Sequence, residues 1–296
     1  MIGGPPRPQG PELISPAGPV AVIEPKGDGL VASLREVWKY RGLFGFFARR
    51  FLEKRYVRTW LGWLWLPLRP LSTVLSRALV FGGVIGISTG NVPYVLFFLI
   101  GQAAWTLFYE ATYWSTRSLE LSRATLRRVH VPRLIPLLSS LAPSVVDCFI
   151  YLAMAAVMVV WYTVADDSFP LVITVRTPYA LIGAGLLCAL GLGIGLLTSV
   201  FAMRARDIRF MLGYLLSFWY FFTPVIYPFE AFPPQFRTLA SLNPATGPVE
   251  LVKVGVFGVG HVTTTAIIIT AVTICTLWIA GLAFFLSREA GAASGA

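Results

Sequence analysis

Long apolar stretches alternate with short polar segments along this chain of 296 residues. A helix needs roughly 20 apolar residues to cross about 30 Å of hydrocarbon. Stretches near that length lie at about 62–87, 93–114, 134–164, 178–202, 210–227 and 262–286. The pattern therefore predicts an all-α integral membrane protein with six transmembrane helices.

Lysine and arginine are concentrated in every second segment between these stretches. Residues 1–61 carry ten of them, 115–133 carry five, 203–209 carry three and 287–296 carry one. The segments on the other side carry three in all. Because cytoplasmic loops of membrane proteins are enriched in basic residues, both termini are predicted to be cytoplasmic. The net charge of +10 then reflects membrane topology, and we expect no nucleic acid partner.

The first 30 residues are rich in proline and glycine and lack the basic start and apolar run of a signal peptide. They predict a disordered cytoplasmic tail. The remaining chain is divided into an interfacial segment at 31–61, a transmembrane domain at 62–286 and a second cytoplasmic tail at 287–296.

The residues at 43–58 have the period of an amphipathic helix. One arc of the helix holds Phe44, Phe47, Ala48, Phe51 and Leu52, and the opposite arc holds Arg49, Arg50, Glu53 and Lys54. This pattern predicts an interfacial helix on the membrane surface. Arg55 and Phe46 break the pattern, so the sequence also allows one face on lipid and another on protein. A docking surface for a cytoplasmic partner is the functional alternative.

Two other segments lie between predicted spans. The residues at 118–133 can form a short helix that presents arginines to a partner, or can be basic only because they are cytoplasmic. The stretch at 227–258 contains five prolines, which forbid one continuous helix, yet it is too apolar for a free loop. It predicts two short re-entrant helices between spans five and six.

The chain lacks the motifs of an ATPase or a metal enzyme. A P-loop needs a lysine directly before Ser or Thr, and none of the four lysines meets this condition. The three cysteines and two histidines lack paired spacing, so we expect no catalytic residue, no metal and no cofactor in this chain. The glycines at 191–197 lie inside an apolar span, which favours close helix packing over nucleotide binding.

Ionisable residues inside membrane spans usually find partners within the protein. Arg77 and Asp147 lie at similar depths, roughly 20 Å from the cytoplasmic ends of their spans at about 1.5 Å per residue. We therefore expect Arg77 and Asp147 to form an intramembrane pair.

Four segments resemble, in order and spacing, successive motifs of ABC-2 type transporter permeases. They are RYVRTWLGWLWLPLRPL at 55–71, VHVPRLIPLL at 129–138, ARDIRFMLGYLLSFWYFFTPVIYP at 205–228 and LNPATGPVELVKVGVFG at 242–258. Within this family the chain is most similar to polysaccharide and O-antigen exporter permeases, over about residues 35–286. It departs from them at Phe51, where an acidic residue is common, and at Ala124, where Asn is common.

The resemblance implies a homodimer in the bacterial plasma membrane that exports a lipid-linked polysaccharide between its two copies. It also implies two ABC nucleotide-binding subunits, which would bind ATP and Mg²⁺ in place of this chain. The residues that would couple to those subunits are Phe47, Arg50, Phe51, Lys54, Glu120, Arg127, Arg128 and Arg133.

Aromatic rings stack on the apolar faces of sugars, and Tyr and Trp also offer hydrogen bonds. Candidates for a glycan path are therefore Trp60, Trp63, Trp65, Trp219, Tyr220, Phe222 and Tyr227. An aromatic belt facing lipid is the alternative for each of them. For the whole chain, the alternatives are a teichoic-acid or small-lipid exporter of the same family and an integral-membrane enzyme acting on lipid-linked sugars.

Overall fold

The computed structural model describes residues 30–56, 62–90, 92–129, 131–165, 176–203, 205, 207–258 and 260–293. Within these residues every regular element is helical. Four helical segments are long and apolar enough to cross a membrane: Tyr94–Leu126, Leu134–Val164, Thr177–Ala202 and Thr264–Phe284. The predicted all-helical membrane fold is confirmed at this level. Of the predicted tail at 1–30, residues 1–29 lie outside the described residues.

The elements follow the predicted order. They are α1 (Leu30–Lys39), α2 (Leu43–Tyr56), the 3₁₀ turn η1 (Gly62–Leu64), α3 (Trp65–Arg77), the π-helical η2 (Ala78–Val84), α4 (Tyr94–Leu126), α5 (Leu134–Ser139), α6 (Leu141–Ala165), α7 (Thr177–Ala202), α8 (Asp207–Phe221), the 3₁₀ turn η3 (Phe229–Ala231), α9 (Pro234–Leu242), α10 (Thr246–Phe257) and α11 (Thr264–Ala293).

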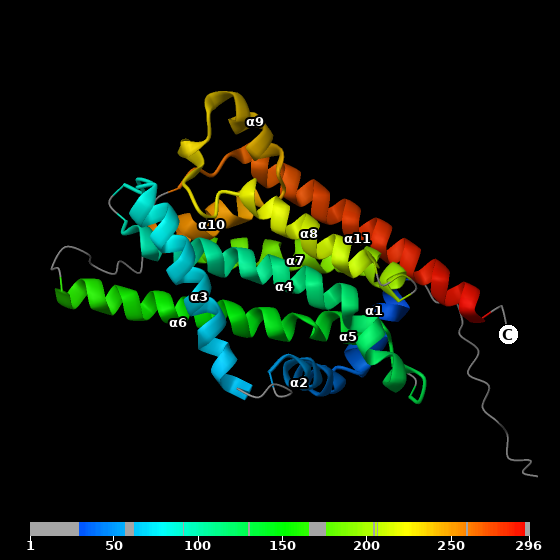
Figure 1. Cartoon of the computed structure of the whole chain (residues 1–296). Coiled ribbons are helices and arrows are strands. Elements are labelled where there is room, and N and C mark those ends of the chain that lie inside the picture. The colour runs from blue at the N-terminus through cyan, green and yellow to red at the C-terminus, as the bar shows by residue number, and fades with distance from the viewer. Residues whose placement is uncertain are drawn as a thin grey trace, which may run out of the picture.

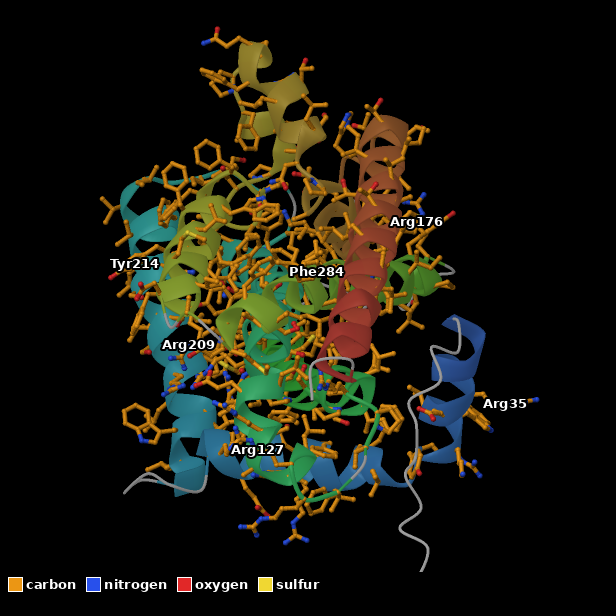
Figure 2. All side chains as sticks on the ribbon, turned by 90° about the vertical axis from the view of Figure 1, so that its right-hand side faces the viewer. Arg35, Arg127, Arg176, Arg209, Tyr214 and Phe284 are labelled. Atoms are coloured by element: carbon orange, nitrogen blue, oxygen red, sulfur yellow. The ribbon has the colours of Figure 1, made fainter. Side chains whose placement is uncertain are left out.

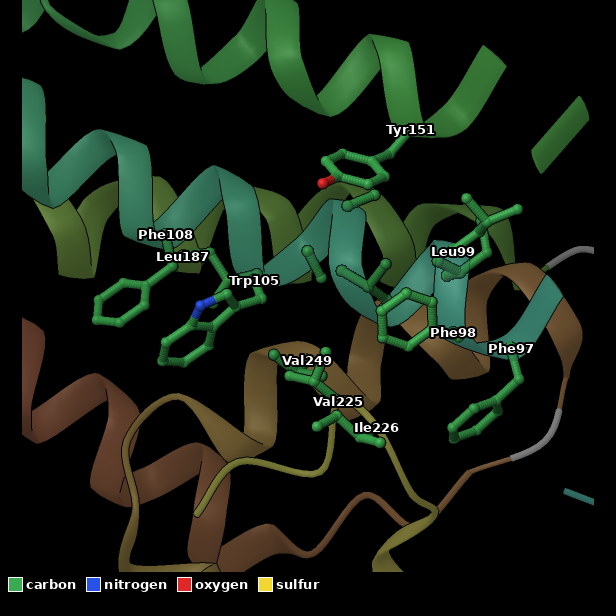
Figure 3. Packing of buried hydrophobic residues seen from close by; sticks show 14 of the residues in the cluster. Phe97, Phe98, Leu99, Trp105, Phe108, Tyr151, Leu187, Val225, Ile226 and Val249 are labelled. Carbon is green, nitrogen blue, oxygen red and sulfur yellow. The ribbon is translucent and has the colours of Figure 1, made fainter. Parts of the chain in front are cut away.

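Helix α4 lies at the centre of the fold and contacts α6, α7, α8 and α10 (Figure 1). Its apolar side chains fill the space between those helices, and Figure 3 shows them facing Tyr151 of α6 and Val249 of α10. The buried α4 residues labelled in this view are Phe97, Phe98, Leu99, Trp105 and Phe108. Helix α3 crosses α4 and α6 at a steep angle and contacts both.

The glycines of α7 allow the close packing that the sequence predicted. A Cβ atom on Gly191 would lie 2.8 Å from the Cβ of Ala111 on α4, and one on Gly195 would overlap Ser115. On the other face of α7, a Cβ on Gly193 would lie 3.0 Å from Leu277 of α11. Small residues therefore bring α7 against α4 and α11 at once.

Three element ends differ from the predicted spans. The second span continues as helix to Leu126, so half of the segment expected as a separate helix at 118–133 is an extension of α4. The third predicted span is divided at Ser140 into α5 and α6, between Pro136 and Pro143. The predicted fifth span at 210–227 ends too late, because the helix stops at Phe221, ahead of Pro224.

The backbone after α8 is irregular but buried. Lys253 of α10, itself buried, donates to the carbonyl of Pro224 and lies 3.1 Å from Glu250. These bonds satisfy groups that would otherwise be costly in an apolar interior. The two short helices predicted within 227–258 are present as α9 and α10. Helix α10 is largely buried in the protein, whereas α9 projects from one side of the bundle (Figure 1).

Candidate functional site

A polar cavity of about 370 Å³ lies between α3, α4, α6 and α8, beside the end of α2. Charged and aromatic side chains from all five helices face it. We call it the arginine cavity, because three arginines line it. Its wall includes Arg55, Tyr56, Trp65, Arg69, Thr73, Arg77, Gln102, Trp105, Tyr109, Glu110, Asp147, Tyr151, Ser217 and Tyr220.

At one end of the cavity, Arg55 of α2 binds carboxylates from two other helices. Its guanidinium nitrogens lie 2.6 and 2.8 Å from the two carboxylate oxygens of Glu110 on α4. The same guanidinium donates to Asp147 on α6, which also accepts from the hydroxyl of Tyr56. The side chains of Arg55 and Asp147 are each only 10% exposed. This Arg55 cluster therefore joins α2, α4 and α6 through nearly buried charges.

The surroundings of Arg55 keep it charged. Burial on its own lowers the pKa of Arg55, but Glu110 and Asp147 raise it above its ordinary value. Burial and the neighbouring Asp147 also raise the pKa of Tyr56, so its hydroxyl remains a hydrogen-bond donor at neutral pH. A buried ion pair is stable only while both charges remain paired, so the cluster is sensitive to the loss of any member.

Deeper in the cavity, Arg77 is held by neutral groups. It donates to Gln102 at 3.1 Å and lies over the ring of Tyr220, 4.4 Å from the centroid. Tyr220 in turn donates to the same Gln102 oxygen at 2.8 Å. The predicted Arg77–Asp147 pair is wrong, because Asp147 binds Arg55 and Tyr56 instead. The prediction failed because it compared only depths within predicted spans and left out Arg55, which precedes the first span.

Arg69 lies on α3 two turns before Arg77. Its guanidinium lies over the ring of Trp65, 5.7 Å from the centroid. Arg69 is exposed on this chain, although it also faces the cavity. Among the described residues, neither Arg69 nor Arg77 has a carboxylate within 4.0 Å.

A second cavity, of about 410 Å³, adjoins the first between α4 and α8 and shares Tyr109 and Ser217 with it. Tyr109 and Tyr113 stack with their ring planes 10° apart, and Arg117 donates to the hydroxyl of Tyr113 at 2.6 Å. Arg209 also lines this cavity and binds Glu120 with both distances at 2.9 Å. Tyrosines and arginines line both cavities.

The apolar arc of α2 packs against protein. Phe47 and Phe51 are each 1% exposed and form a small core with Trp114 of α4 and Ile135 of α5. The sequence allowed this arc to face either lipid or protein, and at Phe47 and Phe51 it faces protein. The two rings are not on a surface that a partner can touch, and they hold α2 to α4 and α5.

The basic arc of α2 also reaches α4. Arg50 donates to the hydroxyl of Thr125, and Lys54 donates to the carbonyl of Leu121 at 2.7 Å. Among the predicted coupling residues, the exposed cations are Arg127 and Arg128, which follow the last helical turn of α4. Figure 2 shows this end of the molecule, with Arg127 near its lower edge. Arg133 is half-buried beyond the turn.

The aromatic candidates do not form one group. Trp65 and Tyr220 line the arginine cavity, as do Trp105 and Tyr109, which the sequence did not single out. Trp219 donates to Asn243 at 2.8 Å and packs on Phe108 in the core. Phe222 is exposed beside Phe218, and Tyr227 packs on Phe232. The side chains of Trp60 and Trp63 lie outside the described residues.

The sequence reasoning missed Arg55, Glu110 and Gln102 as site residues. Arg55 did leave a signal, because it is a cation on the apolar arc of an otherwise regular amphipathic helix. Glu110 is a carboxylate inside a predicted span, which marks a functional or paired group. Gln102 is a single amide in an apolar run and gave no comparable signal.

Comparison with known proteins places these features in context. The profile of the ABC-2 type transporter family matches residues 43–257, from α2 to the end of α10. The chain is 25% identical to the O-antigen export system permease protein RfbA of Myxococcus xanthus, over 73% of this chain and 80% of the relative. It is also 24% identical to the polysialic acid transport protein KpsM of Escherichia coli, over 81% of this chain and 91% of the relative.

Proposed function

This chain belongs to the ABC-2 type transporter family, and from that premise we propose that it is the membrane-spanning subunit of an ABC exporter. Its cargo is a polysaccharide of the O-antigen or cell-wall type, attached to a lipid and moved outward across the bacterial plasma membrane. A separate subunit hydrolyses ATP. The observation that carries the proposal is the family match, which includes both α2 and the arginine cavity. The similarity to an O-antigen export permease and to a polysialic acid transport protein agrees with it.

The two cavities support a polar path for the cargo. Aromatic faces and hydrogen-bonding groups both line them, which suits a glycan that is apolar on its ring faces and polar at its hydroxyls. Helices α3 and α8 border this path and carry exposed apolar side chains, including Leu75 and Phe218. We propose that a second copy of the chain covers this surface and completes the path as a homodimer.

In this proposal all six predicted stretches span the membrane, with both termini in the cytoplasm. The helices α9 and α10 then belong to the outer side and enter the membrane without crossing it. The prolines of the segment and the buried, hydrogen-bonded backbone around Pro224 support this arrangement, since non-helical backbone at membrane depth must be enclosed by protein.

Helix α2 and the turn after α4 are proposed to contact the ATPase subunit. Because the Phe47 and Phe51 core joins α2 to α4 and α5, these elements move together when the ATPase closes. The Arg55 cluster carries the same displacement to Glu110 and Asp147 in the cavity wall. ATP binding changes the path only if these contacts differ between its two states.

The proposal is tested by expressing this chain with the ABC ATPase encoded beside it and purifying both in mild detergent. We expect a complex of two copies of each, with ATP hydrolysis that vanadate inhibits. Deleting the chain in its own bacterium should leave glycan-bearing lipid inside the cell. Normal surface glycan in the deletion strain, together with an ATPase that never co-purifies, would refute the exporter. Accumulation of a lipid without glycan would instead identify a small-lipid exporter.

A further inference from the structure

Among the residues that the structure describes, the arginine cavity carries more positive than negative charge. Three arginines and two carboxylates line it. Both carboxylates are bound to Arg55, so Arg69 and Arg77 are left with neutral or aromatic partners. Asp147 also faces Arg69 across the cavity at longer range. An arginine within a membrane span is costly unless it faces water or an anion.

A second copy of the chain offers no spare carboxylate at this depth. In the six apolar stretches of the whole sequence, Glu110 and Asp147 are the only acidic residues. Each copy in a homodimer uses both of them for its own Arg55. The missing anion must therefore come from a bound ligand or from solvent.

Arg69 and Arg77 are arranged for a ligand with more than one anionic oxygen. They are eight residues apart on one helix, which separates them by about 12 Å along the axis and places them near the same face. Gln102 and Tyr220 fix the guanidinium of Arg77, while the other guanidinium lies over Trp65. Guanidinium groups bind phosphate oxygens through paired, charge-assisted hydrogen bonds.

We propose that the arginine cavity binds a phosphate or diphosphate group through Arg69 and Arg77. This deepens the proposed function, on which it rests, by identifying the part of the cargo that the cavity recognises: the phosphate linkage between lipid and glycan. Arg69 binds the group first, and Arg77 binds it farther along α3. The apolar tail remains outside the cavity.

The test measures binding to the full chain purified in dodecyl maltoside, which contains no phosphate. The probes are undecaprenyl diphosphate, phosphatidylglycerol and, as an uncharged control, undecaprenol, each titrated by native mass spectrometry. The variants are Arg69→Gln, Arg77→Gln and Arg77→Lys. Arg49→Gln is the matched control, because it removes one arginine charge from an exposed ion pair on α2, outside the cavity.

We expect undecaprenyl diphosphate to bind, and each Arg→Gln change in the cavity to weaken binding by about tenfold or more. Arg77→Lys should lose less, and Arg49→Gln should match the parent. Phosphatidylglycerol binding with the same arginine dependence would support the phosphate site and assign it to membrane lipid. Undecaprenol binding as tightly as its diphosphate, or equal binding by all variants, would overturn the proposal.

Two features of the experiment distinguish a failure of the phosphate site from misfolding of a variant and from a failure of the proposed exporter function. Size-exclusion profiles report whether each variant folds, and Arg69→Gln, at an exposed position, still tests the site if Arg77→Gln does not fold. The binding assay also requires no ATPase. Failure to co-purify with an ATPase would refute the exporter and leave the phosphate site standing, whereas arginine-independent binding would refute only the site.

Discussion

Arg55 and Arg77 line the same cavity but have opposite surroundings. Arg55 binds two carboxylates from two helices, whereas Arg77 binds an amide and an aromatic face. A buried arginine that binds carboxylates joins helices, and it stabilises the fold only together with those partners. An arginine held by neutral groups remains available to an anion. Within one cavity, an arginine with carboxylate partners thus has a structural role, and an arginine without them has a binding role.

The largest expected effect comes from removing Arg55. Arg55→Met leaves Glu110 and Asp147 buried without a cation, which should lower the free energy of unfolding by about 3–5 kcal/mol. Thermal unfolding of the purified chain and its recovery as a single species measure this loss. The triple variant that also carries Glu110→Gln and Asp147→Asn should regain much of the stability. An Arg55→Met protein as stable as the parent would remove the distinction between the two arginines.

The corresponding change at Arg77 should separate function from stability. Arg77→Met removes hydrogen bonds only to neutral partners, so its unfolding free energy should change by about 1 kcal/mol or less. Export of the glycan to the cell surface should nevertheless fall by about tenfold or more, since one charge-assisted contact to phosphate is lost. Surface glycan staining measures export, and the thermal midpoint measures stability. A large loss of both would mean that Arg77 is structural.

Gln102→Glu would give Arg77 the kind of partner that Arg55 already has. The new carboxylate keeps an acceptor for Arg77 and for the hydroxyl of Tyr220. We expect unchanged or slightly higher thermal stability together with roughly tenfold weaker binding of undecaprenyl diphosphate, because the arginine is already neutralised. Gln102→Met is the control for loss of the amide alone. Undiminished binding by the Glu variant would argue that Arg77 does not contact the anion.

The smallest effect is expected where an ion pair is exposed. Arg49 and Glu53 lie one turn apart on α2, 2.8 Å from each other, with side chains 83% and 51% exposed. Arg49→Gln should change the unfolding free energy by less than about 0.5 kcal/mol, since water screens such pairs. The same thermal assay provides the lower bound for the series. A loss comparable to that of Arg55→Met would show that burial does not control these pairs.

Hydrophobic patterning predicted the helices well, because long apolar runs have few structural alternatives. It placed the end of the fifth stretch too late, because the buried side chains from Thr223 to Ile226 continue the apolar run beyond the end of α8. That segment is non-helical because Pro224 lacks an N–H and because Lys253 of a distant helix satisfies its carbonyl. Such a partner is 29 residues away in the chain and has no local sequence signal.

The site was harder to predict than the fold. The predicted pair, Arg77 and Asp147, consists of two residues that do line the cavity, but each binds a different partner. Their real partners depend on how α2 turns back across α4 and α6, which periodicity does not specify. The basic residue that breaks the amphipathic arc of α2 was the most useful clue, because an arginine on an apolar face needs a polar partner inside the protein.

The glycine contacts of α7 also limit which parts of the transporter can move. With Gly191 and Gly195 against α4 and Gly193 against α11, sliding among these three helices would make atoms of neighbouring helices collide. We therefore expect them to act as a rigid scaffold throughout the transport cycle. The width of the path must then be changed by α3 and α8, which border it and lack such glycine contacts with the scaffold among the described residues.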